Sequence, residues 1–107
     1  MFFNNEVLYS QIVEQLQPLN LEKIILFGSY AYGKPNEDSD LDLCIIEKSF
    51  NNIWEEKKKI RAMLKNIKMP KDILVTNLKD YEFYRKEINS VYNDIDTKGR
   101  VLWQRSS

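Results

Sequence analysis

Apolar residues recur at intervals of three or four in three parts of the chain, and this spacing predicts three amphipathic helices. The first covers residues 5–17 and ends before Pro18. The second covers residues 52–67 and opens with a pattern typical of a helix capping box. The third runs through residues 77–98 and is capped by Gly99. The apolar positions expected to face the core are Leu8, Ile12, Val13 and Leu16 in the first helix, Ile53, Ile60, Met63, Leu64 and Ile67 in the second, and Tyr84, Ile88, Val91 and Ile95 in the third.

Short runs rich in β-branched residues lie between these helices and predict strands. The expected strands are 23–27, 41–46 and 72–76, and the tail 100–104 is either an edge strand or a docking segment. Residues 29–34 are expected to form a turn or a short helix, and 35–39 a loop. The elements together predict an α/β (α+β) domain with a small mixed sheet and helices packed on it. No linker or repeat divides the chain, so we expect one domain over residues 1–107.

Composition and charge limit the classes of function that the chain can have. The 107 residues carry 16 Lys+Arg and 16 Asp+Glu, a formal net charge of zero. A duplex nucleic-acid binder usually has a basic excess, so none is expected here. There is no histidine and a single cysteine, Cys44, expected to be a small buried apolar residue. Acid–base and metal chemistry must then fall to carboxylates. No long apolar run suggests a signal peptide or membrane span, and the expected location is the cytoplasm.

Two aspartates stand where a strand would be better packed by apolar residues. Asp40 and Asp42 are two positions apart, so on a strand both carboxylates project to the same face. Two like charges that close repel unless a cation lies between them. Asp72 opens the next strand and adds a third carboxylate if the two strands are neighbours. Three such groups suit a two-metal Mg²⁺ site for phosphoryl or nucleotidyl transfer.

Gly28 and Ser29 follow the first predicted strand. Glycine at this position lets the backbone approach a phosphate, and the turn that follows offers unpaired N–H groups to an anion. The Gly-Lys-Ser/Thr ending of a Walker P-loop is missing. Taken alone, Asp38, Ser39 and Asp40 are more typical of a turn that leads into a strand than of a site, and Asp72 is equally typical of an ordinary turn residue. Only the combination of all these features favours a site.

The chain resembles the minimal nucleotidyltransferases of the polymerase-β superfamily. The family core, Gly-Ser-x(10)-Asp-x-Asp, is matched without gaps by Gly28, Ser29, Asp40 and Asp42, and Asp72 occupies the place of the third carboxylate. The resemblance implies the polymerase-β-like nucleotidyltransferase fold and transfer of a nucleoside monophosphate, with ATP as substrate and two Mg²⁺ ions. It extends to the closing segment 99–103.

The resemblance also implies a role for each residue. Asp40, Asp42 and Asp72 would hold the metals, and Asp72 would help deprotonate the acceptor hydroxyl. The nucleotide-binding residues would be Gly28, Ser29, Lys34 and Ser39. Many relatives have an arginine where this chain has Tyr32, which leaves Lys34 as the nearest candidate for charge pairing with the triphosphate.

Three hypotheses for the function remain open. In the family, minimal nucleotidyltransferases are commonly paired with an all-helical HEPN toxin, and this implies AMP transfer to a tyrosine of such a partner by an antitoxin. The chain could instead neutralise its partner by binding alone, through a surface rich in aromatic residues (Tyr81, Phe83, Tyr84, Tyr92 and Trp103). A small-molecule nucleotidyltransferase of the aminoglycoside type would need a pocket that this short chain could build only as a homo-oligomer.

Overall fold

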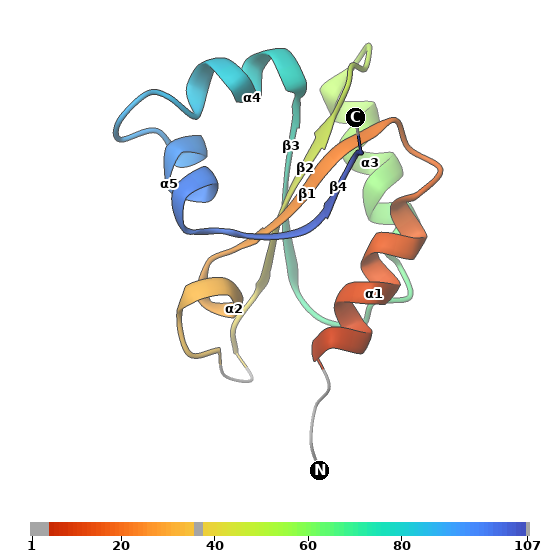
Figure 1. Ribbon diagram of the computed structural model, residues 1–107. Helices are drawn as coiled ribbons and strands as arrows, with labels where there is room; N and C mark the ends of the chain where they lie inside the picture. The colour runs from red at the N-terminus through yellow and green to blue at the C-terminus, as the bar shows by residue number, and fades with distance from the viewer. Residues whose placement is uncertain (1–4, 36–37, 107) are drawn as a thin grey trace.

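The computed structural model describes residues 5–35 and 38–106, and within them helices and strands alternate along most of the chain (Figure 1). Residues 36 and 37 of the expected loop lie outside the described residues, as do residues 1–4 and 107. The elements are α1 (Asn5–Leu16), β1 (Leu21–Phe27), α2 (Ser29–Tyr32), β2 (Leu41–Glu47), α3 (Ile53–Met63), β3 (Lys71–Asn77), α4 (Leu78–Tyr84), α5 (Val91–Lys98) and β4 (Arg100–Gln104). None of the helices in this part of the chain is long and apolar enough to cross a membrane.

The four strands form a mixed sheet in the order β3-β2-β1-β4, which confirms the predicted architecture. Strand β1 is antiparallel to both β2 and β4, whereas β2 and β3 are parallel and are joined by α3. A parallel pair needs such a crossover connection. The tail that was expected as an edge strand or a docking segment is the edge strand β4.

Helices cover the two faces of the sheet unequally. Alternate residues of β2 point to opposite faces. Leu41, Leu43 and Ile45 join the larger core, which α1 and α3 cover. Cys44 and Ile46 join a smaller core with Tyr81 of α4 and Ile95 of α5. Figure 1 shows α1 and α3 on one side of the sheet and α4 and α5 on the other, beside the end at which β3 finishes. We call this second side the carboxylate face, because it also bears Asp42.

The third predicted helix is broken in two. Helix α4 ends at Tyr84, Asn89 has a φ of 76°, and α5 begins after Ser90. The Ser90 hydroxyl donates to the carbonyl oxygen of Tyr84 at 2.6 Å and accepts from the Asn93 N–H at 3.0 Å. A left-handed residue followed by a serine N-cap cannot continue a helix. The helical spacing across the break was therefore misleading, and of its apolar positions Ile95 is buried while Tyr84, Ile88 and Val91 are exposed.

The second predicted helix is correct at its start and too long at its end. The Asn52 side chain accepts hydrogen bonds from the Trp54 and Glu55 N–H groups, as expected for an N-cap. Helix α3 stops at Met63 rather than residue 67, although Leu64 and Ile67 remain buried in the turns that follow. Ile53 was expected in the core and is 42% exposed, because it occupies the first turn at the rim of the sheet.

Loss of the Ser90 cap should loosen α5. We expect Ser90→Ala to lower the free energy of unfolding by about 1 kcal/mol, since one helix N–H loses its partner. Urea denaturation measures the change. Ser10→Ala, an exposed position within α1, is the matched control and should be neutral or slightly stabilising. An equal effect of the two substitutions would show that the cap contributes nothing.

Candidate active site

Three strand ends meet beside the short helix α2 (Figure 1). Strand β1 finishes there, and β2 and β3 begin there. The register places Phe27 opposite Asp42 across the antiparallel pair, and Asp42 opposite Asp72 across the parallel pair. Three segments that are far apart in sequence thus bring together the residues that the sequence analysis singled out. The assumption that the second and third strands are neighbours is confirmed.

Asp42 points to the carboxylate face of the sheet. It alternates with Leu41 and Leu43, which are buried under α1 and α3, and therefore shares a face with Cys44. Helices α4 and α5 cover the other end of this face, so Asp42 is half-buried and Asp72 is exposed. Asp40 lies one residue before β2 and is exposed. The site is open at the surface rather than enclosed.

The three aspartates act on one another electrostatically. The pKa of Asp42 is raised, first by burial and then by the negative charges of Asp72 and Asp40. A carboxylate that two like charges surround is a favourable position for a cation. In residues 5–35 and 38–106, however, no three carboxylate or thiol side chains are already gathered closely enough to hold a metal ion. The carboxylates are neighbours that would have to turn toward an ion to hold it together.

Gly28 is the residue against which the Asp42 carboxylate rests. Its φ is 72° and its ψ is −155°, a backbone conformation that only glycine adopts without strain. A Cβ at this position would lie 2.0 Å from Oδ2 of Asp42. The Gly28 carbonyl oxygen accepts from the N–H groups of Ala31 and Tyr32, and this starts the single turn of α2. Glycine is thus required both by the backbone and by the carboxylate beside it.

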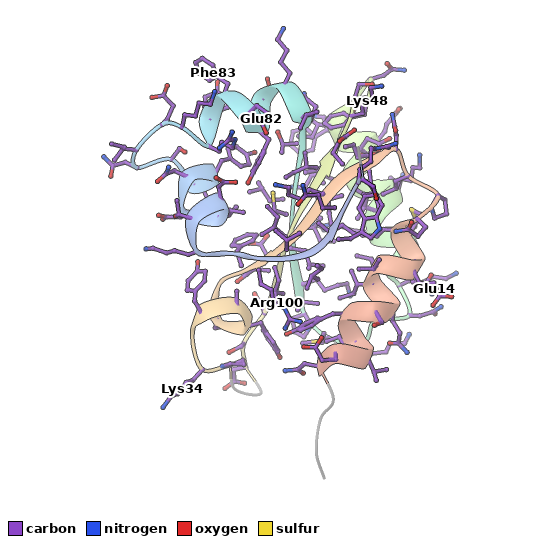
Figure 2. The ribbon with its side chains drawn as sticks, in the orientation of Figure 1. Glu14, Lys34, Lys48, Glu82, Phe83 and Arg100 are labelled. Atoms are coloured by element: carbon purple, nitrogen blue, oxygen red, sulfur yellow. The ribbon has the colours of Figure 1, made fainter. Side chains whose placement is uncertain are left out.

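The other predicted nucleotide-binding residues are less closely associated. Ser29 follows Gly28 directly and is half-buried at the start of α2. Ser39 is half-buried just before Asp40. Lys34 is exposed, and Figure 2 shows its side chain extending away from the sheet beyond α2. Tyr32, which stands before Lys34 at the end of α2, is 53% exposed. Lys34 would have to swing inward to reach a ligand on the carboxylates.

An apolar floor beside the aspartates was not anticipated from sequence. Phe27, opposite Asp42, and Leu74, two positions after Asp72, are both half-buried and pack against the core of the carboxylate face. Phe27 was expected only as a strand residue, and Leu74 only as a residue on the same strand face as Asp72. The signal was available in the alternation of β3, since residues 72 and 74 share a face. Cys44 belongs to the same core, fully buried as predicted, and burial raises the pKa of its thiol to about 12.

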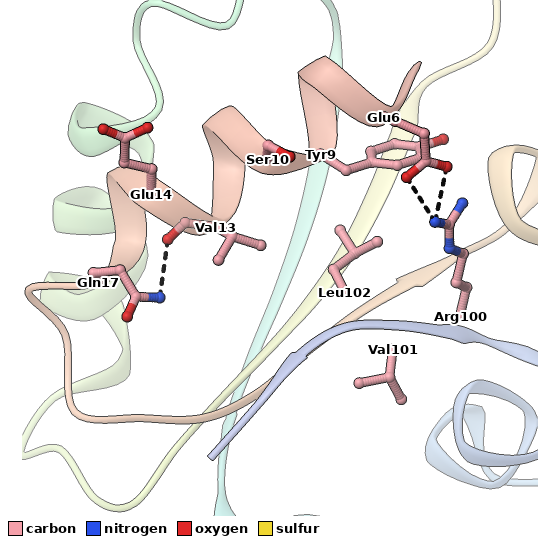
Figure 3. A pocket seen from close by; sticks show the side chains of 9 residues that line it. All are labelled: Glu6, Tyr9, Ser10, Val13, Glu14, Gln17, Arg100, Val101 and Leu102. Carbon is pink, nitrogen blue, oxygen red and sulfur yellow. Dashed lines mark hydrogen bonds and ion pairs between the residues drawn. The ribbon is translucent and has the colours of Figure 1, made fainter. Parts of the chain in front are cut away.

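A groove of about 410 Å³ lies elsewhere, between α1 and β4 (Figure 3). Arg100 is the cation within it, and it is engaged by Glu6 at 2.8 Å and stands 5.3 Å from the ring centre of Tyr9. Glu6 and Glu14 also line the groove. The two carboxylates would repel a triphosphate, and Arg100 is already paired with Glu6. The groove is therefore unsuited to a triphosphate, despite its volume. Helix α1 packs on the face opposite the aspartates, so the two features are separate.

Comparison with known proteins identifies the family. Residues 8–97 match the family model described as "Nucleotidyltransferase domain". A protein of Methanocaldococcus jannaschii, described as "Putative protein adenylyltransferase MJ0141", is 35% identical over 74 residues, which cover 69% of this chain and 70% of that protein.

Solved structures show the same fold. A structure from Sulfolobus solfataricus, described as "a putative nucleotidyltransferase", aligns with a TM-score of 0.64 and 18% identity, over 94% of this chain and 79% of the other. A chain from the complex of the tri-AMPylated Shewanella oneidensis HEPN toxin with its MNT antitoxin aligns with a TM-score of 0.62 and 16% identity, over 95% and 74%. Strand register, the glycine at the end of β1 and the family match all agree, and the chain belongs to the nucleotidyltransferase domain family.

Proposed function

We propose that this chain transfers AMP from ATP to a tyrosine hydroxyl of a HEPN toxin and so acts as its antitoxin. The observation that carries the proposal is the position of Asp42, held between Gly28 and Asp72 on the uncovered end of the sheet. The M. jannaschii relative, with its adenylyltransferase description, supports the reaction. The AMPylated toxin complex, and a toxin–antitoxin structure with AMP-PNP, at 24% identity and a TM-score of 0.59, support the acceptor and the nucleotide.

The donor set fits Mg²⁺. Burial and the negative charges of Asp72 and Asp40 raise the pKa of Asp42. A hard cation would therefore relieve the repulsion among these three carboxylates. Asp40, Asp42 and Asp72 would hold two ions. Such ions, when bound, would neutralise the negative charge of the phosphates.

The chain's own residues would carry out the remaining steps. The main-chain N–H groups that follow Gly28, together with the Ser29 hydroxyl, would position the triphosphate, with Ser39 and Lys34 as further contacts. Asp72 would accept the proton of the acceptor hydroxyl. The hydroxyl oxygen then bonds to the α-phosphorus as the bond from that phosphorus to the bridging oxygen breaks, and pyrophosphate leaves. Exposure of Asp40 and Asp72 leaves room for an acceptor as large as a protein loop.

Labelled ATP tests the reaction and the acceptor together. We expect label in the α-phosphate to move to the helical partner when the chain and Mg²⁺ are present, and label in the γ-phosphate to leave as pyrophosphate. The modified residue is then located by mass spectrometry. Transfer of the γ-label would show a kinase, and transfer of the α-label to an aminoglycoside without any partner would favour a small-molecule enzyme.

The titration of Asp42 gives a second expectation. Its raised pKa means that the metal-free fold is favoured by protonation, a contribution that is present below the ordinary pKa of 3.8 and is lost as the pH rises through the folded pKa. Mg²⁺ with a non-hydrolysable ATP analogue should reverse the shift, because a cation favours the ionised form. Carboxyl NMR of Asp42 measures both pKa values. An Asp42 pKa that Mg²⁺ and the analogue leave unchanged would place the ions elsewhere.

Exposed apolar residues favour one second candidate, an antitoxin that acts by binding alone. Of the aromatic residues expected at an interface, Tyr81 is buried, whereas Phe83 is 61% and Tyr84 45% exposed. Ile88 in the following turn is also exposed. Growth of cells that express the toxin separates the two candidates. Neutralisation of the toxin by an Asp42→Asn antitoxin, with no label transfer, would support binding alone.

A further inference from the structure

Two glutamates meet at the end of β2 that lies farthest from the aspartates. Glu47 is the last residue of β2 and is only 3% exposed, and Glu56 lies in the first turn of α3. Oε2 of Glu47 and Oε2 of Glu56 are both buried, and neither has a hydrogen-bond partner among the described residues. Figure 2 labels the neighbouring Lys48 at the opposite end of the molecule from Lys34. The proposed reaction uses neither glutamate.

The surroundings of Glu47 are nearly all unfavourable to a negative charge. Burial raises the pKa of Glu47 to about 8, together with the Glu56 side chain, which acts on it both at short range and through its charge. The charged groups that act on it are Glu56 and Lys59, both from α3, and the main-chain N–H of Asn20 before β1 also contributes. Lys59 and the Asn20 N–H lower the pKa but do not offset the other effects.

We propose that Glu47 and Glu56 share one proton, and that this proton fastens the start of α3 to the end of β2. The proton resides on Glu47, whose carboxyl group donates to Glu56. A negative charge is better placed on Glu56, because that residue lies in the first turn of a helix and 3.8 Å from Lys59 Nζ. One shared proton gives a hydrogen bond to both of the buried oxygens that otherwise have none.

A bound cation is the competing explanation for two carboxylates that face each other. The structure favours the proton, since a metal ion between them would stand beside the Lys59 ammonium group. Moreover, no group of three metal-binding side chains occurs in the described part of the chain, and two carboxylates make a poor site for a divalent ion. A proton needs only the two oxygens.

The shared proton makes this junction sensitive to a rise in pH from about 4.5 to about 8. A carboxyl group with a raised folded pKa stabilises the fold below its ordinary pKa of 4.5, and that contribution is lost as the pH rises toward about 8. Loss of the proton leaves two facing negative charges. We expect residues 48–56 to open first, because they contain the turn and the helix start that the pair connects.

Carboxyl NMR and amide hydrogen exchange on the full chain test the proposal. We expect the pKa of Glu47 to lie near 8, well above the ordinary value of 4.5. The opening constant of amides near the start of α3, corrected for intrinsic exchange, should rise on the order of 100-fold between about pH 6 and about pH 9.5. A Glu47 that titrates near 4.5 would overturn the shared proton.

Matched variants distinguish the pair from general alkaline loosening. Glu47→Gln supplies a permanent N–H donor to Glu56, so its opening constant should be nearly independent of pH. Glu55→Gln, an exposed neighbour in the same helical turn, should keep the pH dependence of the natural chain. The same pH dependence in Glu47→Gln would overturn the proposal. So would addition of Ca²⁺ alone, if it closed the junction at alkaline pH in the natural chain and not in Glu47→Gln, since that result would show a cation site.

Discussion

Replacing Asp42 with asparagine should strongly reduce nucleotidyl transfer and at the same time make the metal-free protein more stable. Transfer falls because the substitution removes the central carboxylate of the site, and we expect a loss of at least about 100-fold in kcat. Stability rises because burial and the charges of Asp72 and Asp40 all disfavour an ionised Asp42. Opposite signs of the two effects are the signature of a residue kept for function at the expense of the fold.

Label transfer and thermal unfolding in the presence of a chelator measure the two effects. Asp94→Asn is the matched control, because Asp94 is exposed on α5 and its carboxylate forms a surface ion pair with Lys98 at 3.9 Å. It should leave transfer unchanged and alter stability by less than about 0.5 kcal/mol. An Asp42→Asn protein that transfers label at the natural rate would remove Asp42 from the site, and one that unfolds more easily would assign it a structural role.

Near the site, Gly28→Ala should reduce stability and activity more than the addition of a methyl group at any other position. The backbone conformation of Gly28 is strained for any other residue, which costs on the order of 1–3 kcal/mol. The new methyl group would also lie 2.0 Å from Oδ2 of Asp42 and must displace it. We therefore expect both a lower free energy of unfolding and a loss of transfer. Urea denaturation and the label assay report the two.

A double-mutant cycle separates strain from overlap. Gly28→Ala combined with Asp42→Ala removes the carboxylate that the methyl group meets, so part of the lost stability should return while the backbone strain remains. Gly33→Ala is the control, because Gly33 has an ordinary φ of −119° and a new Cβ would meet its nearest atom at 3.0 Å. It should cost less than Gly28→Ala. Strict additivity of Gly28→Ala and Asp42→Ala would contradict the contact.

The candidate site could be predicted largely from sequence because it depends on local rules. The strand-to-turn change at Gly28 and the spacing of Asp40 and Asp42 each follow from a few neighbouring residues. The parallel pairing of β2 with β3 was needed to add Asp72, and a strand-helix-strand order favours it. The mixed sheet and the edge strand β4 also follow from patterns along the chain.

Other features depend on contacts that no local pattern specifies. The break between α4 and α5 rests on the hydrogen bond from the Ser90 hydroxyl back to Tyr84, and the helical spacing gives no sign of it. Lys34 lies just after the short helix α2, and its side chain extends away from the sheet (Figure 2). The pairing of Glu47 with Glu56 requires the end of a strand and the start of a helix to meet in space. The two glutamates are nine residues apart in the sequence, and no local pattern predicts their contact.

A crystal structure with Mn²⁺ and a non-hydrolysable ATP analogue tests the central claim most directly, because anomalous scattering locates the metal without any assumption about the reaction. We expect metal density between Asp42 and Asp72, with Asp40 turned toward it and the phosphates beside Gly28 and Ser29. Metal and nucleotide in the groove between α1 and β4, or metal density away from the aspartates, would contradict the assignment of the carboxylate face as the nucleotidyl-transfer site.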